Sequence, residues 1–173
     1  MKPILIPILF AVLSGCAHPV EPASSPSFNN ISSYTAKIPG KYLILIDAEY
    51  LTGTIKPSDM NCAAHNYPLD LRSSFKQSTL QTLRNVFDEL EEVTTAVDAK
   101  EMKKRNARGL VVVRGESFNS TLRVQPGYWT ATLESRFSIV ATVSVDKPKG
   151  RVFGSSFEGI HVDSADAGLF CSG

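Results

Sequence analysis

Apolar and polar residues alternate along residues 129–145, so that one set of side chains faces each side of an extended strand. The apolar set is Trp129, Ala131, Leu133, Phe137, Ile139, Ala141, Val143 and Val145. A period of two is typical of an antiparallel strand with one face against a core and the other in water. We predict a hairpin loop at residues 146–150 and a further strand at residues 151–162, with Gly154 and Gly159 as bulges or kinks.

Two other stretches begin as continuous apolar runs, which is typical of buried strands. These are residues 42–51, closed by Thr52 and Gly53, and the run from Leu110 towards Val124. A helical segment separates the two runs, which permits them to pair in parallel. Residues 54–70 contain Pro57, Asn61, Asn66 and Pro68 and predict a long loop that is either functional or tied down.

Helical spacing of apolar residues predicts a first helix at residues 74–93, opened by the capping box Ser74 to Gln77. Its apolar face comprises Phe75, Leu80, Leu83, Val86, Phe87, Leu90 and Val93. The acidic residues towards its end are Asp88, Glu89, Glu91 and Glu92. They could bind a metal or act as general acids, but we favour a solvated face in which Arg84 and Asp88 form a pair at i,i+4.

A second helix is predicted from Asp98, which suits an N-cap, to Gly109, which suits the C′ position. Its last turns hold the basic residues Lys103, Lys104, Arg105 and Arg108. Cations at this end complement the helix dipole, and we favour this structural role over contact with an anionic lipid headgroup.

These elements predict an α+β domain over residues 38–173, in which a strand is followed by two helices and then three strands. We expect two layers, with both helices packed on one face of a mixed four-stranded sheet. A chain of 173 residues suits one domain. Its 18 Lys and Arg residues balance 17 Asp and Glu residues, so no overall field would attract nucleic acid, and we expect no nucleic-acid partner.

The N-terminus has the pattern of an export signal. Lys2 gives a basic start, and the apolar stretch from Ile4 to Leu13 is shorter than the roughly 20 residues that span a bilayer. The stretch ends Leu13-Ser14-Gly15-Cys16, which resembles the lipobox of bacterial lipoproteins. The resemblance implies that residues 1–15 are a signal peptide and that the thiol of Cys16 receives a diacylglycerol.

The same resemblance implies a location in the cell. Ala17 follows Cys16 where an Asp would typically retain a lipoprotein in the inner membrane, so the outer membrane is expected, with the domain facing the periplasm by default. Residues 16–37 then form a lipidated cysteine and a flexible tether rich in Pro and Ser.

Two cysteines remain if lipid occupies Cys16. In an oxidising compartment an even pair predicts a disulfide, here between Cys62 and Cys171. Cys62 and His65 also have a spacing seen among metal ligands, but a zinc site needs three or four ligands. We therefore expect no metal and no cofactor.

Enzyme motifs are incomplete. The run from Gly154 to Gly159 lies in a predicted strand rather than at the strand-to-helix turn of a nucleophile elbow. None of the three histidines lies in a recognisable catalytic frame. We expect no catalytic residue and no enzymatic activity.

The order of elements over residues 40–162 resembles the small periplasmic α+β lipoproteins that are auxiliary parts of transport and export machines. These include accessory lipoproteins of lipopolysaccharide assembly, curli secretion and ABC transport. Such families usually place a further helix after the hairpin, where this chain has residues 167–173. The resemblance implies a non-enzymatic accessory component, anchored by acyl chains to outer-membrane lipid, that binds a protein partner in an envelope complex.

Three surfaces are candidates for that contact: the 54–70 loop with His65 and Tyr67, an exposed sheet edge, and the aromatic tip Tyr128-Trp129. The alternative is a small envelope inhibitor or hydrolase acting near peptidoglycan. It predicts a deep pocket that joins His65 to an acid with a perturbed pKa.

Overall fold

The computed structural model describes residues 36–57, 66–127 and 131–166. The elements are β1 (Ile38–Asp47), β2 (Thr52–Ile55), β3 (Tyr67–Asp70), α1 (Arg72–Val86), β4 (Phe87–Glu92), α2 (Ala99–Lys104), β5 (Gly109–Pro126), β6 (Ala131–Lys147) and β7 (Gly150–Asp166). They form a five-stranded sheet of order β4-β1-β5-β6-β7 and a two-stranded sheet of β2 and β3. The predicted α+β class is confirmed, and the prediction of a four-stranded sheet is wrong.

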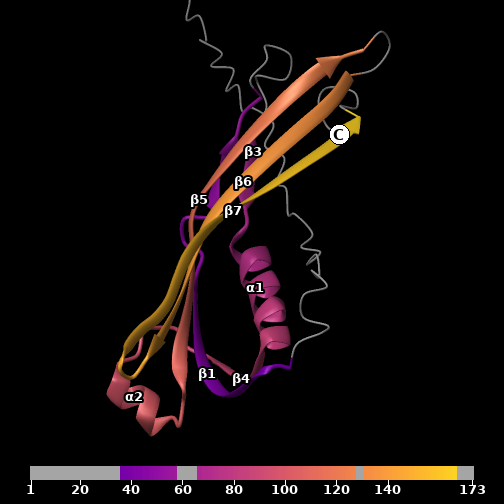
Figure 1. Cartoon of the computed structure of the whole chain (residues 1–173). Coiled ribbons are helices and arrows are strands. Elements are labelled where there is room, and N and C mark those ends of the chain that lie inside the picture. The colour runs from indigo at the N-terminus through magenta and orange to yellow at the C-terminus, as the bar shows by residue number, and fades with distance from the viewer. Residues whose placement is uncertain (1–35, 58–65, 128–130, 167–173) are drawn as a thin grey trace, which may run out of the picture.

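The main sheet is mixed. β1 lies parallel to both β4 and β5, while β5, β6 and β7 form an antiparallel meander. The parallel pairing of the two apolar runs and the meander are therefore confirmed. Figure 1 shows that β5, β6 and β7 continue beyond β1 as a long three-stranded ribbon. The β2–β3 pair packs along this extension.

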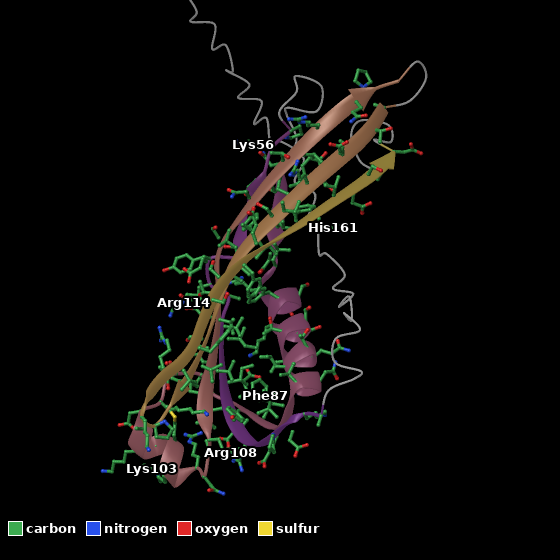
Figure 2. The ribbon with its side chains drawn as sticks, in the orientation of Figure 1. Lys56, Phe87, Lys103, Arg108, Arg114 and His161 are labelled. Carbon is green, nitrogen blue, oxygen red and sulfur yellow. The ribbon has the colours of Figure 1, made fainter. Side chains whose placement is uncertain are left out.

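The first helix is shorter than the sequence predicts. It ends at Val86, and Phe87 is already extended with φ −110° and ψ 148°. Phe87 then packs against Tyr42 with ring centroids 4.6 Å apart, beneath α1 (Figure 2). The backbone of β4 gains a ladder of hydrogen bonds with β1, and this pairing outweighs the helical spacing of the apolar residues. The predicted i,i+4 pair of Arg84 and Asp88 is therefore wrong, since Asp88 lies in β4.

The start of α1 also differs. The N-cap residue is Leu71, whose apolar side chain cannot accept a hydrogen bond. Ser74 lies inside the first turn, so the predicted capping box is wrong. The predicted N-cap of α2 is confirmed, because the Asp98 carboxylate accepts a 2.7 Å hydrogen bond from the Glu101 backbone N–H. However, α2 ends at Lys104, and Asn106 rather than Gly109 occupies the C′ position, with a left-handed φ of 57°.

The two helices cover opposite faces of the sheet, which corrects the expectation that both lie on one. Tyr42 and Val111 belong to the cluster that packs against α1, together with Phe75, Leu83 and Val86. Their chain neighbours Leu43 and Leu110 belong to a second cluster with Met102 of α2. Successive side chains of a strand point to opposite faces. Burial on both faces therefore explains why β1 and the start of β5 are continuously apolar.

Residues 54–70 are not a single loop. The end of β2 and all of β3 lie within them, and the two strands pair from Thr52 with Asp70 to Ile55 with Tyr67. The pair packs on the upper part of the main sheet in a cluster of Leu51, Ile55, Tyr67, Leu69, Leu71, Leu122, Val124 and Leu133. The two strands have four residues each and β3 contains Pro68, so their sequence signal is weak and this sheet was not predicted.

A bulge in β5 keeps its apolar side chains on one face. The register shifts between Gly115 and Ser117, which leaves Glu116 as the extra residue. Val111 and Val113 face α1 before the bulge, and Leu122 and Val124 face the β2–β3 pair after it. Without the extra residue the later pair would point to the opposite face. Among the described residues, the β6–β7 register has no bulge at Gly154 or Gly159 and runs unbroken from Phe153 to Asp166, and its shift near Val145 leaves Val152 as the extra residue.

Gly115 marks a close approach at this bulge. A Cβ atom added there would lie 2.6 Å from Cδ1 of Leu51, a side chain with 0% exposure. We expect Gly115→Ala to lower the free energy of unfolding by about 1–3 kcal/mol, because the surrounding core has no room to relax. Urea unfolding measures the difference.

Gly159→Ala is the matched control, since an added Cβ meets nothing within 4 Å there. We expect it to change the free energy of unfolding by less than about 0.5 kcal/mol. Equal losses in the two variants would contradict the close packing of Leu51 on β5.

Candidate functional site

The outer edge of β7 is the most distinctive surface of the described structure. β7 has 17 residues, and every one of them is exposed. In the part of the chain that the structure describes, β7 pairs with β6 and with no other strand. It is the yellow strand that runs along one side of the molecule in Figure 1. Its outer backbone groups are thus available to another strand.

Exposed apolar side chains concentrate on this strand. Seven large apolar residues are exposed among those described, and five of them belong to β7. These five are Val152, Phe153, Phe157, Ile160 and Val162, with exposures of 50–57%. A gathering of this kind on one element marks an interaction surface, whereas single exposed apolar residues are ordinary.

The apolar side chains of β7 lie on both faces of the sheet. Phe153 and Phe157 pair with Val145 and Ala141, whose side chains face the α1 side. Ile160 and Val162 have the opposite parity and pair with Ser138 and Arg136. A strand that is apolar on both faces is typical of the interior of a sheet, not of its edge. The sequence of β7 therefore suits a strand with a neighbour on each side.

The opposite edge of the same sheet is built differently. β4 has only six residues, and four of them are acidic. Glu91 forms ion pairs with Lys41 at 2.6 Å and with Arg105 at 2.8 Å, and Glu92 pairs with Lys76. Short length and charge are the usual protection of an edge against strand pairing. Between Val152 and Val162, by contrast, β7 has only Glu158 as a charged residue.

A groove adjoins the first residues of β7 on the α2 side. Its volume is about 570 Å³, and the apolar residues that line it include Leu45, Val97, Leu110 and Val112. Arg114, Asp146 and Arg151 also line it, together with Gly154 and Ser155. The guanidinium of Arg114 donates to Asp47 at 3.0 Å, and that of Arg151 donates to Asp146 at 2.8 Å. Both cations are thus neutralised within the chain.

Of the four predicted contact residues, only Tyr67 is among the residues that the structure describes. Tyr67 is 6% exposed and belongs to the core under the β2–β3 pair, and burial raises the pKa of its hydroxyl. Its ring is therefore structural rather than a contact surface. His65 and the tip Tyr128-Trp129 lie outside the described residues, as do Cys16, Cys62 and Cys171. Lipidation and the disulfide stay predictions.

The apolar residues of β7 were not among the predicted contact residues. A signal was present, because apolar residues in residues 152–162 occupy both odd and even positions. Residues 129–145 alternate instead, as a strand with one wet face should.

Ion pairs account for the lowered carboxyl pKa values. Side-chain hydrogen bonds from Arg72 lower the pKa of Asp70 to about 2. Hydrogen bonds from Lys41 and Arg105 lower the pKa of Glu91, and a hydrogen bond from Arg105 lowers that of Glu101. These groups are ionised at neutral pH, so they suit structural ion pairs rather than general acids. Among the described residues, no three His, Cys, Asp or Glu side chains gather as a metal site.

The basic residues around α2 are partly explained by the same pairs. Arg105 donates to Glu101 at 2.9 Å and to Glu91 at 2.8 Å, which raises the pKa of its guanidinium. Arg108 lies against Gly40, whose φ of +93° a larger residue would adopt only with strain. These contacts support the structural interpretation of the cluster.

The lowered pKa values predict a stability that depends on pH. The ionised carboxylates contribute fully above the unfolded pKa, near 4.5 for Glu and 3.8 for Asp. Their contribution is lost as the pH falls through the lowered folded pKa values, and for Asp70 that value is about 2. We expect the urea midpoint to fall as the pH is lowered below about 4.5. Glu91→Gln should reduce this dependence; an unchanged pH profile in that variant would contradict the role of Glu91.

Comparisons with known proteins assign no family. No protein-family model matches the chain, and no curated protein matches it. Among the described residues, no helix is long and apolar enough to cross a membrane.

Solved structures show distant similarity. The chain is similar to protein XCC0632 of Xanthomonas campestris, of family DUF330, with a TM-score of 0.45, 7% identity, and coverage of 85% of this chain and 78% of that one. Lipoprotein GNA1162 of Neisseria meningitidis is similar with a TM-score of 0.39 and 8% identity, over 72% of this chain and 85% of that one. Hypothetical protein CT253 of Chlamydia trachomatis is similar with a TM-score of 0.39 and 12% identity, over 72% of this chain and 73% of that one. None of these similarities assigns a residue or an activity to this chain.

Proposed function

We propose that the chain is a lipoprotein of the bacterial envelope that binds a protein partner through the exposed edge of β7. The partner contributes a strand that pairs with β7 and extends the sheet. The role is that of a non-enzymatic accessory component in a transport, secretion or envelope-biogenesis machine. Acyl chains on Cys16 hold the domain to the outer membrane, facing the periplasm.

The observation that carries this proposal is the contrast between the two edges of one sheet. β4 is short and charged, whereas β7 is long, exposed throughout and apolar on both faces. An exposed edge of this kind promotes uncontrolled association unless a partner covers it. Strand addition fits it, since main-chain hydrogen bonds supply affinity and the alternating side chains supply specificity.

The location rests on the N-terminal sequence. The order of Lys2, the apolar stretch, Ser14-Gly15 and Cys16 is that of a lipoprotein signal, and Ala17 suits the outer membrane. Two or more acyl chains hold a protein stably to a bilayer, whereas one binds only marginally.

A non-enzymatic role agrees with the chemistry of the described residues. Their lowered carboxyl pKa values arise from ion pairs on the surface, and the guanidinium groups at the groove are paired within the chain. The alternative hydrolase depends on His65, which lies outside those residues.

A photo-reactive amino acid at a single position tests the proposal. Placed at Ile160 of the full chain in the cells that make it, the probe is expected to yield a covalent adduct with a protein on irradiation. Asp88 is the matched control, because it is exposed on β4 at the opposite edge of the same sheet. No adduct at Ile160, or equal yields at the two edges, would contradict the proposal.

A further inference from the structure

We infer that the end of the domain at which β1 starts docks on the bilayer, where its basic side chains bind the phosphate headgroups of anionic phospholipids. This surface, the basic end, is defined by six exposed cations: Lys37, Lys100, Lys103, Arg108, Lys147 and Lys149. The inference rests on the part of the proposed function that places acyl chains on Cys16. It concerns a different surface from the edge of β7.

The six cations come from separate segments that the sheet brings to one end. They precede β1 and β5, belong to α2, and flank the β6–β7 turn. The backbone N–H of Arg108 donates to the carbonyl of Lys41 in β1 at 2.8 Å, and Lys147 pairs with Gly150 at the turn. Figure 1 shows the start of β1, α2 and this turn at the lower end of the molecule. Figure 2 marks Lys103 and Arg108 there.

Ion pairs use other cations of this end but none of these six. Lys41 and Arg105 pair with Glu91 at 2.6 and 2.8 Å, and Arg151 pairs with Asp146 at 2.8 Å. In the part of the chain that the structure describes, no carboxylate lies within ion-pair distance of the six cations. Their charges are thus available to an external anion.

The two ends of the domain differ in charge. At the basic end, the carboxylate of Asp98 caps α2, and the charge of Asp88 is offset by Arg84 in the last turn of α1. The three-stranded ribbon beyond the bulge of β5 has two cations against five carboxylates in its described residues. These are Arg123 and Arg136, and Glu116, Glu134, Glu158, Asp163 and Asp166. An anionic surface therefore attracts the basic end and repels the other.

The anchor is attached to the chain on the side of the basic end. Residues 17–35 connect Cys16 to the first described residue, which directly precedes Lys37 and β1. A flexible tether of about 20 residues, as the sequence predicts, has an end-to-end distance of about 25 Å. β7 alone, with 17 residues, is about 55 Å long. The tether therefore holds the basic end closer to the bilayer than the far end.

An array of headgroups suits these cations better than a single ligand does. They are exposed and spread over several segments, whereas a site for one small anion converges on a pocket. Each basic residue near an anionic bilayer raises the affinity about fivefold, and a basic patch adds to the hold of an acyl chain. The attraction acts within about 10 Å at 0.1 M salt, so docking should depend on salt.

The acylated full chain in vesicles tests the docking. A fluorescent amino acid is placed at Lys104, which is 78% exposed on α2 and is not one of the six, and an acceptor dye is attached to the headgroups. Energy transfer is expected to be greater with about 30% phosphatidylglycerol in phosphatidylcholine than with phosphatidylcholine alone, and to fall to the lower level in about 0.5 M NaCl. A donor at Gln125, exposed at the far end of β5, is expected to give weak transfer in both.

Charge reversal tests which surface is attracted. Lys103→Glu combined with Lys149→Glu is expected to lower the ratio of docked to undocked domains by about tenfold or more on anionic vesicles, since two attractions become repulsions. Arg123→Glu combined with Arg136→Glu is the matched control, because it makes the same change of charge at the far end. It is expected to leave the transfer from position 104 unchanged. Circular dichroism checks that both variants remain folded.

The outcomes separate this inference from the proposed function. Equal transfer with and without anionic lipid, in a chain that floats with both kinds of vesicle, would overturn the docking and leave the anchor and the β7 partner standing. A chain that floats with neither would overturn the anchor and this inference together. Equal losses in the two charge-reversed variants would show that net charge, not the basic end, attracts the lipid.

A photo-reactive amino acid at position 104 in cells identifies what covers the basic end. We expect an adduct with phospholipid on irradiation, and none from position 125. An adduct with a protein and none with lipid would overturn the inference, while an adduct at Ile160 would still support the proposed function.

Discussion

Leu43→Asp is expected to prevent the domain from folding. Leu43 is 0% exposed in β1, the strand between β4 and β5, and it packs with Val93, Met102 and Leu110. An unpaired carboxylate there costs more than about 4 kcal/mol, which is most of the stability of a typical domain. Far-UV circular dichroism and urea unfolding measure the loss.

Asn119→Asp is the control for that variant, since it also adds one carboxylate to a strand but at an exposed position of β5. It is expected to unfold within about 0.5 kcal/mol of the wild type. Unchanged unfolding of Leu43→Asp would show that water reaches the α2 face of β1, contrary to the structure.

Cys16→Ser is expected to move the protein from the membrane fraction to the supernatant. Each buried CH₂ of an acyl chain contributes about 0.8 kcal/mol, so loss of the acylated thiol removes nearly all of the membrane affinity. Fractionation of cells followed by immunoblotting measures the change. Cys62→Ser is the matched control and is expected to remain with the membrane. Continued sedimentation of Cys16→Ser with membranes would contradict the anchor.

Local patterns in the sequence predicted several elements correctly. The alternation in residues 129–145 identified β6, which spans Ala131–Lys147, and the apolar runs identified β1 and the start of β5. Asp98 was recognised as an N-cap because a cap depends on residues only three positions apart. These signals need no knowledge of distant contacts.

Elements that depend on distant partners were not predictable in this way. Phe87, Leu90 and Val93 have helical spacing, yet pairing with β1 makes residues 87–92 a strand. β2 and β3 are four residues each and are stabilised by packing on β5 and β6. The placement of α1 and α2 on opposite faces was implied by the continuous apolar run of β1, because a strand covered on one face alternates.

The candidate site was only partly predictable. An exposed sheet edge was among the expected contact surfaces, but which strand forms it depends on the sheet order β4-β1-β5-β6-β7. Tyr67 was expected at a surface and is buried, because the β2–β3 pair encloses it. Composition alone cannot distinguish a tyrosine in a contact surface from one in a core.

Hydrogen exchange along β7 tests most directly whether its edge receives a partner strand. In dilute purified protein, alternate amides of residues 150–166 should exchange rapidly, because every second N–H of an edge strand points away from its neighbour. In the assembled state the same amides should exchange more slowly by about tenfold or more. Amides of β7 that are already as slow as those of β6 in the dilute protein, or that do not slow on assembly, would contradict the account.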